Sequence, residues 1–340
     1  MDSFSFVPVY KRLTDLYRSR IINQEYLPDQ RIDSITRISE RHSVSRETAK
    51  LVLKNLIKEG LIISKAGKGS FVTPQAKTHS TWGLIIPFFS SNMEELIVSL
   101  NNEASLRKRK FEYYLAYNNP DEEMKLVGRM IREGYEAVIV VPNFNELLTT
   151  GYYLRLLQGN TKVVMVDNTM AGSHFRYVVQ SYDLGVKRAL DYLGSKNNGN
   201  LMLVKNEIWK GKNLLQELIE QTFLTIAADI FPGRKAFVSS QLNDIGKYYL
   251  ESRKIGGILT CVDTDAVRLI GRIKMWEAME VSLVSYGNTE LTSLFQPAIT
   301  VIDCHYQMMA EKTAGFLDEK EPGGGVYQYV IQPSLVIRDT

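Results

Sequence analysis

Basic side chains recur every fourth residue along one segment of the chain, with hydroxyl side chains beside them. The residues concerned are Ser45, Arg46, Thr48, Lys50, Lys54 and Lys58. A spacing of four places the basic groups on one face of a helix. A guanidinium can pair with a guanine edge, while hydroxyl and ammonium groups can bind bases or phosphates. The pattern therefore predicts duplex-DNA recognition by the start of this helix, at Ser45, Arg46, Thr48 and Lys50, with Lys54 and Lys58 on a solvated face.

A hairpin is predicted directly after this helix. Two short apolar or β-branched runs flank a glycine pair, in the order Leu61–Lys65, Ala66–Gly69, Ser70–Val72. Gly67 and Gly69 allow the backbone to approach another surface closely, and Lys65 and Lys68 add positive charge. We expect this hairpin to contact the minor groove or phosphates. A nucleotide-phosphate loop is excluded because the upstream glycine and the following helix of that motif are missing.

A second group of side chains could bind a polyhydroxylated small molecule. Polar or aromatic residues follow apolar runs at Phe88, Phe89, Asn118, Asn143, Asp167, Asn168, Asp263, Tyr286 and Asn288. Ligands of parallel sheets bind beyond the carboxyl ends of the strands. Aromatic rings stack on sugar faces, and amides and carboxylates hydrogen-bond to hydroxyls. The pattern predicts a sugar cleft, although each Asn or Asp alone is also typical of a turn or cap.

Side chains that could catalyse a reaction or hold a metal are scattered along the chain. They are His42, His79, His174, His305, Cys261 and Cys304. None stands at the spacing of a metal site or of a nucleophile motif. We expect no catalytic residue, metal or cofactor, and an enzyme is the distant alternative.

Three helices and the hairpin must position the basic groups. Helical periodicity and capping residues predict helices over 8–23, over 34–41 after Ser34, and from Ser45 to Gly60. Together with the hairpin they form a winged helix-turn-helix over 1–73. A short polar linker is expected over 74–81.

The rest of the chain, 82–340, alternates apolar runs with amphipathic stretches. The runs are Gly83–Pro87, Tyr113–Tyr117, Ala137–Pro142, Val163–Asp167, Leu201–Val204, Gly257–Cys261 and Val281–Tyr286. Fully apolar strands that alternate with helices predict parallel sheets covered on both faces, an α/β fold. Seven such strands could form one doubly wound domain or two smaller ones. No GxGxxG motif follows the first strand, so a dinucleotide site is not supported.

Charge and composition agree with this division. Residues 1–77 contain 14 Lys or Arg and 8 Asp or Glu, a net charge of +6, whereas the remainder has 27 and 30, a net charge of −3. Only the basic head is expected to meet a polyanion. No run approaches the roughly 20 apolar residues of a membrane span, and Met1–Gln30 contains no secretory apolar run. Two distant cysteines make no disulfide framework, so we expect a cytoplasmic protein without a membrane partner.

The head resembles the GntR family of bacterial regulators. The matching segments are Pro8–Tyr10, Val44–Arg46 with Thr48, Leu53–Leu61 and Gly67–Val72. The resemblance implies a winged helix-turn-helix that binds operator DNA. The family usually has Leu-Pro-Ser-Glu-Arg before its second helix, where this chain has Ile32–Thr36. The arginine often used on DNA is therefore missing, and Arg37, one place later, is the candidate replacement.

The body resembles the two-lobed, periplasmic-binding-protein-like effector domain of LacI-type repressors. The matching segments include Gly134–Ile139, Val163–Asp167, Asp263–Ala266, Ile299–Asp303 and Pro333–Arg338. The resemblance implies a first lobe over about 82–178 and 289–325, and a second over about 179–286 and 326–340. It also implies that Asp167 and Asp263 hold sugar hydroxyls and that Phe88 contacts the ligand. Trp209 and Lys210 are candidate second-lobe contacts, with Trp209 equally a core residue.

The two resemblances together are similar to regulators of the arabinose-repressor type. They imply a homodimeric repressor of sugar-utilisation genes, because helix-turn-helix dimers read paired half-sites. The implied partners are double-stranded operator DNA and a sugar such as arabinose or fucose, bound between the lobes and acting allosterically. The alternative effectors are a phosphorylated sugar and a non-sugar metabolite.

Overall fold

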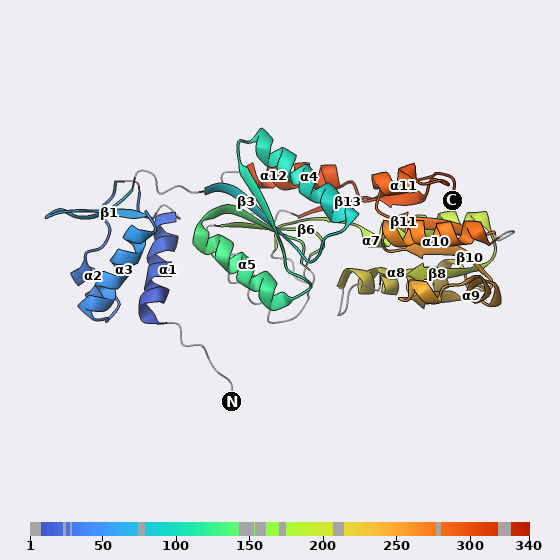
Figure 1. Cartoon of the computed structure of the whole chain (residues 1–340), viewed down its shortest axis with the longest axis horizontal. Helices are drawn as coiled ribbons and strands as arrows, with labels where there is room; N and C mark the ends of the chain where they lie inside the picture. Colours follow the sequence, from blue (N-terminus) through green and yellow to red (C-terminus); the bar gives the residue numbers. More distant parts are fainter. Residues whose placement is uncertain are drawn as a thin grey trace, which may run out of the picture.

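The computed structural model describes residues 8–22, 25–27, 29–73, 79–142, 153, 161–169, 175–206, 214–276, 280–318 and 328–340. A small helical head lies at one end of the molecule, and two α/β lobes follow it in a row (Figure 1). The head and the lobes have separate sheets, so the protein is mixed α/β with parallel sheets in two lobes.

The head consists of three helices and a two-stranded antiparallel hairpin. Its elements are α1 (Val9–Ile22), α2 (Ile35–Arg41), α3 (Arg46–Lys58), β1 (Ile62–Lys65) and β2 (Gly69–Val72). Their apolar faces meet in one core that includes the fully buried Tyr17, Ile38 and Leu56. Ser34 and Ser45 accept hydrogen bonds from the helices that they precede, which confirms both predicted N-caps.

A buried carboxylate sets the start of α2 against α1. Asp33, only 8% exposed, accepts hydrogen bonds from the Tyr17 hydroxyl at 2.8 Å and from the Arg41 guanidinium at 2.6 Å. Arg37 Nε lies 3.4 Å from its other oxygen. Because a buried carboxylate is costly without partners, these contacts hold α1 and α2 in one arrangement.

The first lobe is a six-stranded parallel sheet. In spatial order its strands are β13 (Gln328–Ile331), β7 (Tyr177–Gln180), β6 (Lys162–Asp167), β5 (Tyr135–Val140), β3 (His79–Ile86) and β4 (Lys110–Leu115). The helices α4 (Ser91–Leu106) and α12 (Tyr306–Asp318) pack on the face that contains Leu84 and Ile139. The helix α5 (Pro120–Glu133) covers the opposite face.

The second lobe is a six-stranded sheet that is parallel except for one edge strand. In spatial order its strands are β14 (Ser334–Val336, antiparallel), β12 (Thr300–Asp303), β11 (Ser282–Tyr286), β10 (Ile255–Thr260), β8 (Asn200–Val204) and β9 (Ala236–Ser239). Its helices are α7 (Tyr182–Lys196), α8 (Leu214–Ile230), the 3₁₀ helix η1 (Leu242–Asp244), α9 (Lys247–Ser252), α10 (Asp263–Met275) and α11 (Glu290–Leu294). Apolar residues of α7 and α8 pack on one face and those of α10 on the other.

The structure corrects the predicted boundaries in three places. The strand β3 begins at His79, so 79–81 belong to the sheet and not to the linker. The strand β12 pairs with β11 in the second lobe, although 289–325 was assigned to the first. The strand β13 pairs with β7 in the first lobe, although 326–340 was assigned to the second. Strand pairing decides between the sheets, and a short apolar run carries no signal for which sheet it joins.

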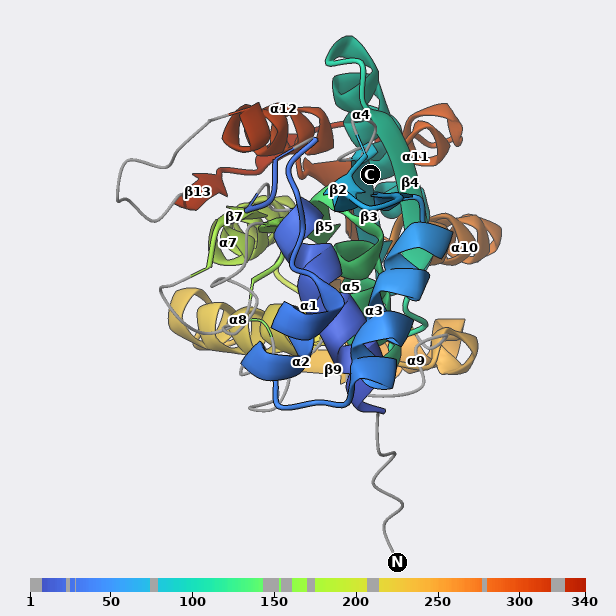
Figure 2. The same cartoon turned by 90° about the vertical axis from the view of Figure 1, so that its left-hand side faces the viewer.

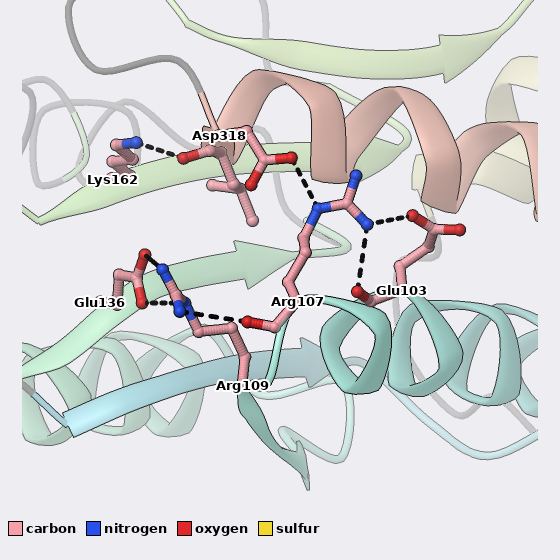
Figure 3. Close-up of polar contacts among 7 residues, drawn as sticks. Glu103, Arg107, Arg109, Glu136, Lys162 and Asp318 are labelled. Atoms are coloured by element: carbon pink, nitrogen blue, oxygen red, sulfur yellow. Dashed lines mark hydrogen bonds and ion pairs between the residues drawn. The ribbon is translucent and has the colours of Figure 1, made fainter.

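An ion-pair network holds two helix ends at the amino ends of the central strands of the first sheet (Figure 3). The Arg107 guanidinium follows α4 and lies 2.7 Å from Asp318 Oδ2 at the end of α12. Arg109 Nε lies 2.6 Å from Glu136 on β5, and the Lys162 ammonium on β6 donates to the carbonyl of Leu317. With their C-terminal ends held here, α4 and α12 direct their N-terminal ends toward the carboxyl ends of the strands.

The chain crosses between the lobes three times, from β7 to α7, from β12 to α12 and from β13 to β14. The fully buried carboxyl of Asp167 lies at these crossings. It accepts hydrogen bonds from Gln180 Nε2 at 2.7 Å and from the Tyr306 hydroxyl at 3.3 Å, and these donors stand at two different crossings. Tyr182, on the far side of the first crossing, donates to its backbone carbonyl at 3.3 Å. Asp167 therefore links the segments that any movement of the lobes must bend.

We expect Asp167→Asn to preserve the fold and to change how stability depends on pH. Burial raises the pKa of Asp167 above its usual 3.8, against the smaller lowering effect of the hydrogen bonds from Gln180, Tyr182 and Tyr306. The folded state thus prefers the protonated carboxyl, so its stability contribution is greatest at low pH and is lost as pH rises through the raised pKa. Asn mimics the neutral acid without that loss.

Urea unfolding of both proteins at pH 5 and pH 8 tests this expectation. The stability of the variant relative to wild type should rise between the two pH values. Asp167→Ala is the comparison, because it strands the buried donors of Gln180 and Tyr306 and should cost about 1–3 kcal/mol. A fall in the relative stability of Asp167→Asn at pH 8 would contradict the account.

Candidate nucleic-acid interface and inter-lobe pocket

The start of α3 presents the predicted hydroxyl pair. Ser45 Oγ accepts a hydrogen bond from the backbone of Thr48 at 3.1 Å and lies 2.9 Å from Thr48 Oγ1. The positive end of the α3 helix dipole lies beside these two hydroxyls and favours a negatively charged ligand there. The start of α3 can thus bind a phosphate oxygen or a base edge.

Arg46 and Lys50 are exposed beside this pair. Arg46 Nη2 donates to Thr36 Oγ1 at 3.0 Å, so α2 orients its guanidinium. Lys50 is 4.0 Å from Glu47 with both side chains well exposed, and such a surface pair contributes little. Both cations are available to an incoming polyanion.

The hairpin has the predicted wing geometry. Its strands pair from Ile62 with Val72 to Lys65 with Gly69. Gly67 and Gly69 have φ of 70° and 107°, which favour glycine, and the Lys65 ammonium lies 4.8 Å above the Phe71 ring. Lys68 is exposed at the tip. Figure 1 shows this hairpin, α2 and α3 at the end of the head that faces away from the lobes, and Figure 2 views that end directly.

Arg37, another predicted DNA contact, pairs with a buried acid, Asp33, which precedes α2. Its side chain is 67% exposed, yet Nε is 3.4 Å from the buried Asp33 carboxylate. Asp33 therefore offsets part of the positive charge of Arg37, and it also pairs with Arg41.

A pocket of about 260 Å³ lies between the lobes. The first lobe lines it with Phe88, Phe89, Ser90, Ser91 and Asn118, and the second with Asn206, Val262, Asp263, Thr264 and Arg268. These residues follow the carboxyl ends of β3, β4, β8 and β10. Pockets for drug-sized ligands measure about 300–1,000 Å³, so this one suits a smaller molecule.

Asp263 joins the two sides of the pocket. Its Oδ1 accepts hydrogen bonds from Ser91 Oγ of the first lobe at 3.0 Å and from the backbone of Thr264 at 2.7 Å. Its Oδ2 accepts one from Thr289 Oγ1 at 2.6 Å. The side chain is thus both a link between the lobes and part of the start of α10.

Four predicted ligand contacts do not line this pocket, because protein groups surround them. Asp167 is buried at the crossings, and Tyr286 donates to the backbone of Tyr182 at 3.0 Å inside the core. Asn168 donates to the carbonyl of Pro142 at 3.3 Å. Asn288 donates to Asp303 at 3.0 Å and accepts from Arg338. The remaining predictions, Asn143, Trp209 and Lys210, lie outside the described residues.

Sequence reasoning missed Ser91, Asn206, Thr264 and Arg268 as pocket residues. Arg268 follows Thr264 by four positions on α10, so both lie on the same helix face. Asn206 Nδ2 donates to Asp265 Oδ2 at 3.0 Å. The helical spacing that follows Asp263 was the available signal for Arg268, whereas nothing in the sequence distinguishes Asn206 from other polar residues after strands.

A larger crevice of about 640 Å³ lies between the head and the first lobe. Its charged lining is largely paired, as in Arg18 with Glu59 at 2.6 Å and Lys110 with Glu112. We therefore regard it as a junction between domains and not as a ligand site. Among the described residues, no helix is long and apolar enough to span a bilayer, and no group of three or more acidic, His or Cys side chains is arranged to hold a metal.

Comparison with known proteins assigns the head. Residues 9–72 match the bacterial regulatory proteins of the gntR family. The chain is also 30% identical over 169 residues to an arabinose metabolism transcriptional repressor from Geobacillus stearothermophilus. That match covers 47% of this chain and 46% of the relative, so it spans less than half of the relative's own length.

Solved structures identify the fold of the body. A LacI-family transcriptional regulator from Silicibacter pomeroyi superposes with a TM-score of 0.67 at 14% identity and covers 97% of both chains. A periplasmic binding protein/LacI transcriptional regulator from Alkaliphilus metalliredigens, complexed with D-xylulofuranose, has a TM-score of 0.61 at 16% identity and covers 77% of this chain and 98% of its own. The chain therefore combines a GntR-family N-terminal domain with a body of the LacI and periplasmic-binding-protein fold.

Proposed function

We propose that this chain is a DNA-binding repressor of sugar-utilisation genes and that a small sugar controls its affinity for the operator. The observation that carries the proposal is the joining of a gntR-family domain to the LacI-type fold. The arabinose metabolism repressor to which half of the chain is similar supports the same role. The proposed activity is binding and not catalysis, and the proposed location is the cytoplasm.

The proposed effector is a monosaccharide such as arabinose or fucose in the inter-lobe pocket. Phe88 and Phe89 provide ring faces, and Asn118 provides an amide that can both donate and accept. The pocket lining contains the Asp263 carboxylate as well as Arg268, and a carboxylate at the site favours a neutral ligand over a phosphorylated one. The sugar-bound neighbour of the same fold supports this choice of ligand class.

Asp263 is the proposed coupling between the effector and the angle of the lobes. In the described structure it binds Ser91 of one lobe and Thr289 of the other. Thr289 lies in the same lobe as Asp263, so a sugar hydroxyl that displaces Ser91 is the exchange that breaks a bond between the lobes. Because a ligand shifts an equilibrium only through its differential affinity, such an exchange is what allosteric control of the head requires.

A homodimer is the proposed assembly. Apolar side chains are exposed along one flank of both lobes, with Val98 52% and Leu106 77% exposed on α4, and Leu294 75% exposed on α11. Tyr113, on the neighbouring edge strand β4, is 46% exposed. Figures 1 and 2 both place α4 and α11 on the same flank. Burying this flank against a second copy would space two heads for paired half-sites.

We expect the full chain to bind duplex DNA with an affinity that falls as salt rises. Each neutralised phosphate releases counterions, so two contacts already predict a loss of about tenfold between 50 and 200 mM salt. Fluorescence anisotropy on a duplex from the region upstream of its own gene measures this dependence. Absence of binding at the lowest salt would refute the proposed function.

Arg46→Ala should reduce discrimination between operator and random DNA by about 1–3 kcal/mol, because a guanidinium can pair bidentately with guanine. Lys68→Ala, at the exposed tip of the wing, is the matched comparison and should weaken binding to both duplexes evenly. Competition titrations with random duplex separate the two effects. Equal losses on both duplexes for Arg46→Ala would reduce Arg46 to a phosphate contact.

Asp263→Asn should abolish the response to the sugar while operator binding is retained. The amide keeps an acceptor for Ser91 and Thr264 but loses the charge-assisted bonds that a carboxylate makes to hydroxyls. A thermal-shift screen over monosaccharides and their phosphates identifies the ligand first, since 100 times the dissociation constant adds about 2.7 kcal/mol.

Asp244→Asn is the control, because it makes the same chemical change at an exposed side chain of the second lobe that does not line the pocket. It should respond to the sugar as wild type does. A normal response to the sugar by Asp263→Asn would leave Asp263 with a structural role alone, at the start of α10.

A further inference from the structure

The segment that precedes α2 belongs to the wing. Asp29 donates its backbone N–H to the carbonyl of Val72 at 3.0 Å, Val72 donates to Gln30 at 2.9 Å, and Ile32 donates to Ser70 at 2.9 Å. Arg31 stands opposite Phe71 in an antiparallel bridge. Residues 29–32 thus extend the hairpin on the β2 side, although 36 residues separate Ile32 from the start of β2 in the sequence.

Alternation along this segment places Arg31 on the outer face of the wing. Ile32 is 2% exposed in the core of the head, so its neighbour Arg31 points to the opposite face. That face also contains Phe71, with the Lys65 ammonium 4.8 Å above its ring. The Arg31 side chain is therefore directed to the same solvent-facing surface as Lys65.

The backbone at Gly69 receives the Arg31 guanidinium. A Cβ at Gly69 would lie 2.7 Å from Arg31 Nε and 3.2 Å from Nη2, so the absence of a side chain makes room for it. The guanidinium thereby lies over the start of β2, next to Lys68 at the tip. Within the part of the chain that the structure describes, no acidic side chain forms an ion pair with Arg31, in contrast to Arg37 and Arg41, which share Asp33.

We propose that Arg31 is a DNA-contacting residue of the wing and that it binds a backbone phosphate beside Lys65 and Lys68. This inference rests on the proposed function. An exposed guanidinium offers paired donors that match the oxygens of a phosphate, and phosphates supply most of the sequence-independent affinity. Arg31 lies at the wing with no acidic partner among the described residues, whereas Arg37 is paired with Asp33. We therefore assign this role to Arg31 in place of Arg37.

Fluorescence anisotropy of the full chain on one random-sequence duplex, across a salt series, tests the inference. Arg31→Ala should weaken binding and lower the slope of log affinity against log salt by about 0.9 for each bound head. Arg31→Lys keeps the charge and should retain the wild-type slope. Lys11→Ala is the control, since it removes one exposed charge from α1, at a smaller cavity that Arg132 of the first lobe also lines.

The outcomes separate the two proposals. If wild type binds neither this duplex nor the upstream region, the proposed function fails. If wild type binds and Arg31→Ala matches Lys11→Ala in slope, the inference is overturned, as it is if Arg31→Lys loses as much slope as Arg31→Ala. A melting curve is recorded for each variant. If Arg31→Ala melts well below wild type, Arg31→Gln replaces it, and the salt slope of Arg31→Gln must then fall by the same amount.

Discussion

The three crossings between the lobes impose the main constraint on this molecule. Each lobe has its own sheet and its own helices, so the short crossing segments and the groups that bind them, together with contacts such as that of Ser91 with Asp263, set the relative position of the lobes. Asp167 accepts hydrogen bonds from Gln180 and Tyr306, which stand at two of these segments. The third segment approaches the same region, since Ser181 donates its backbone N–H to Ile331 at 2.9 Å. The Asp167 carboxyl has no exposed surface, so water cannot take the place of its hydrogen-bond donors, and bending must involve this cluster as a unit.

The pocket lies beyond these crossings and depends on them for its shape. Its walls are turns after strands of both sheets, and Asp263 bonds across from α10 to Ser91 at the start of α4. The ion pairs of Arg107 and Arg109 hold α4 from its other end. Movement of one lobe against the other therefore changes the distance between Ser91 and Asp263 without disturbing either sheet. That separation of a rigid scaffold from an adjustable contact is what ligand-dependent control needs.

The head depends on different interactions, because its proposed activity, DNA binding, takes place on its surface and not in a cavity. Asp33 holds α1 and α2 through Tyr17 and Arg41, and the caps at Ser34 and Ser45 define where two helices begin. The basic groups thereby stand on α3 and the hairpin, elements that lie at the end of the molecule remote from the lobes (Figure 1). Attraction to phosphates is long in range and tolerant of small displacements, so a small domain with one core is sufficient for it.

The local elements were largely determined by the sequence, since caps, periodicity and glycine position act over a few residues. Ser45, Gly60 and the Gly67–Gly69 pair defined α3 and the wing, and each of the seven predicted apolar runs overlaps a strand. The strands β7, β9, β12, β13 and β14 were not predicted, because they span four residues or fewer and several are half-exposed. Runs this short carry little periodic signal.

Tertiary structure alone decided which residues meet. Phe88, Asn118 and Asp263 come together although they lie far apart in the chain, while Asp167 and Tyr286, equally placed after strands, turn into the core. Arg31 belongs to the wing because its backbone pairs with Phe71, and no sequence pattern near Arg31 predicts this pairing. The physical reason is the same in each case: the sequence sets the character and the local conformation of a segment, whereas sheet order and the crossings between lobes set its neighbours.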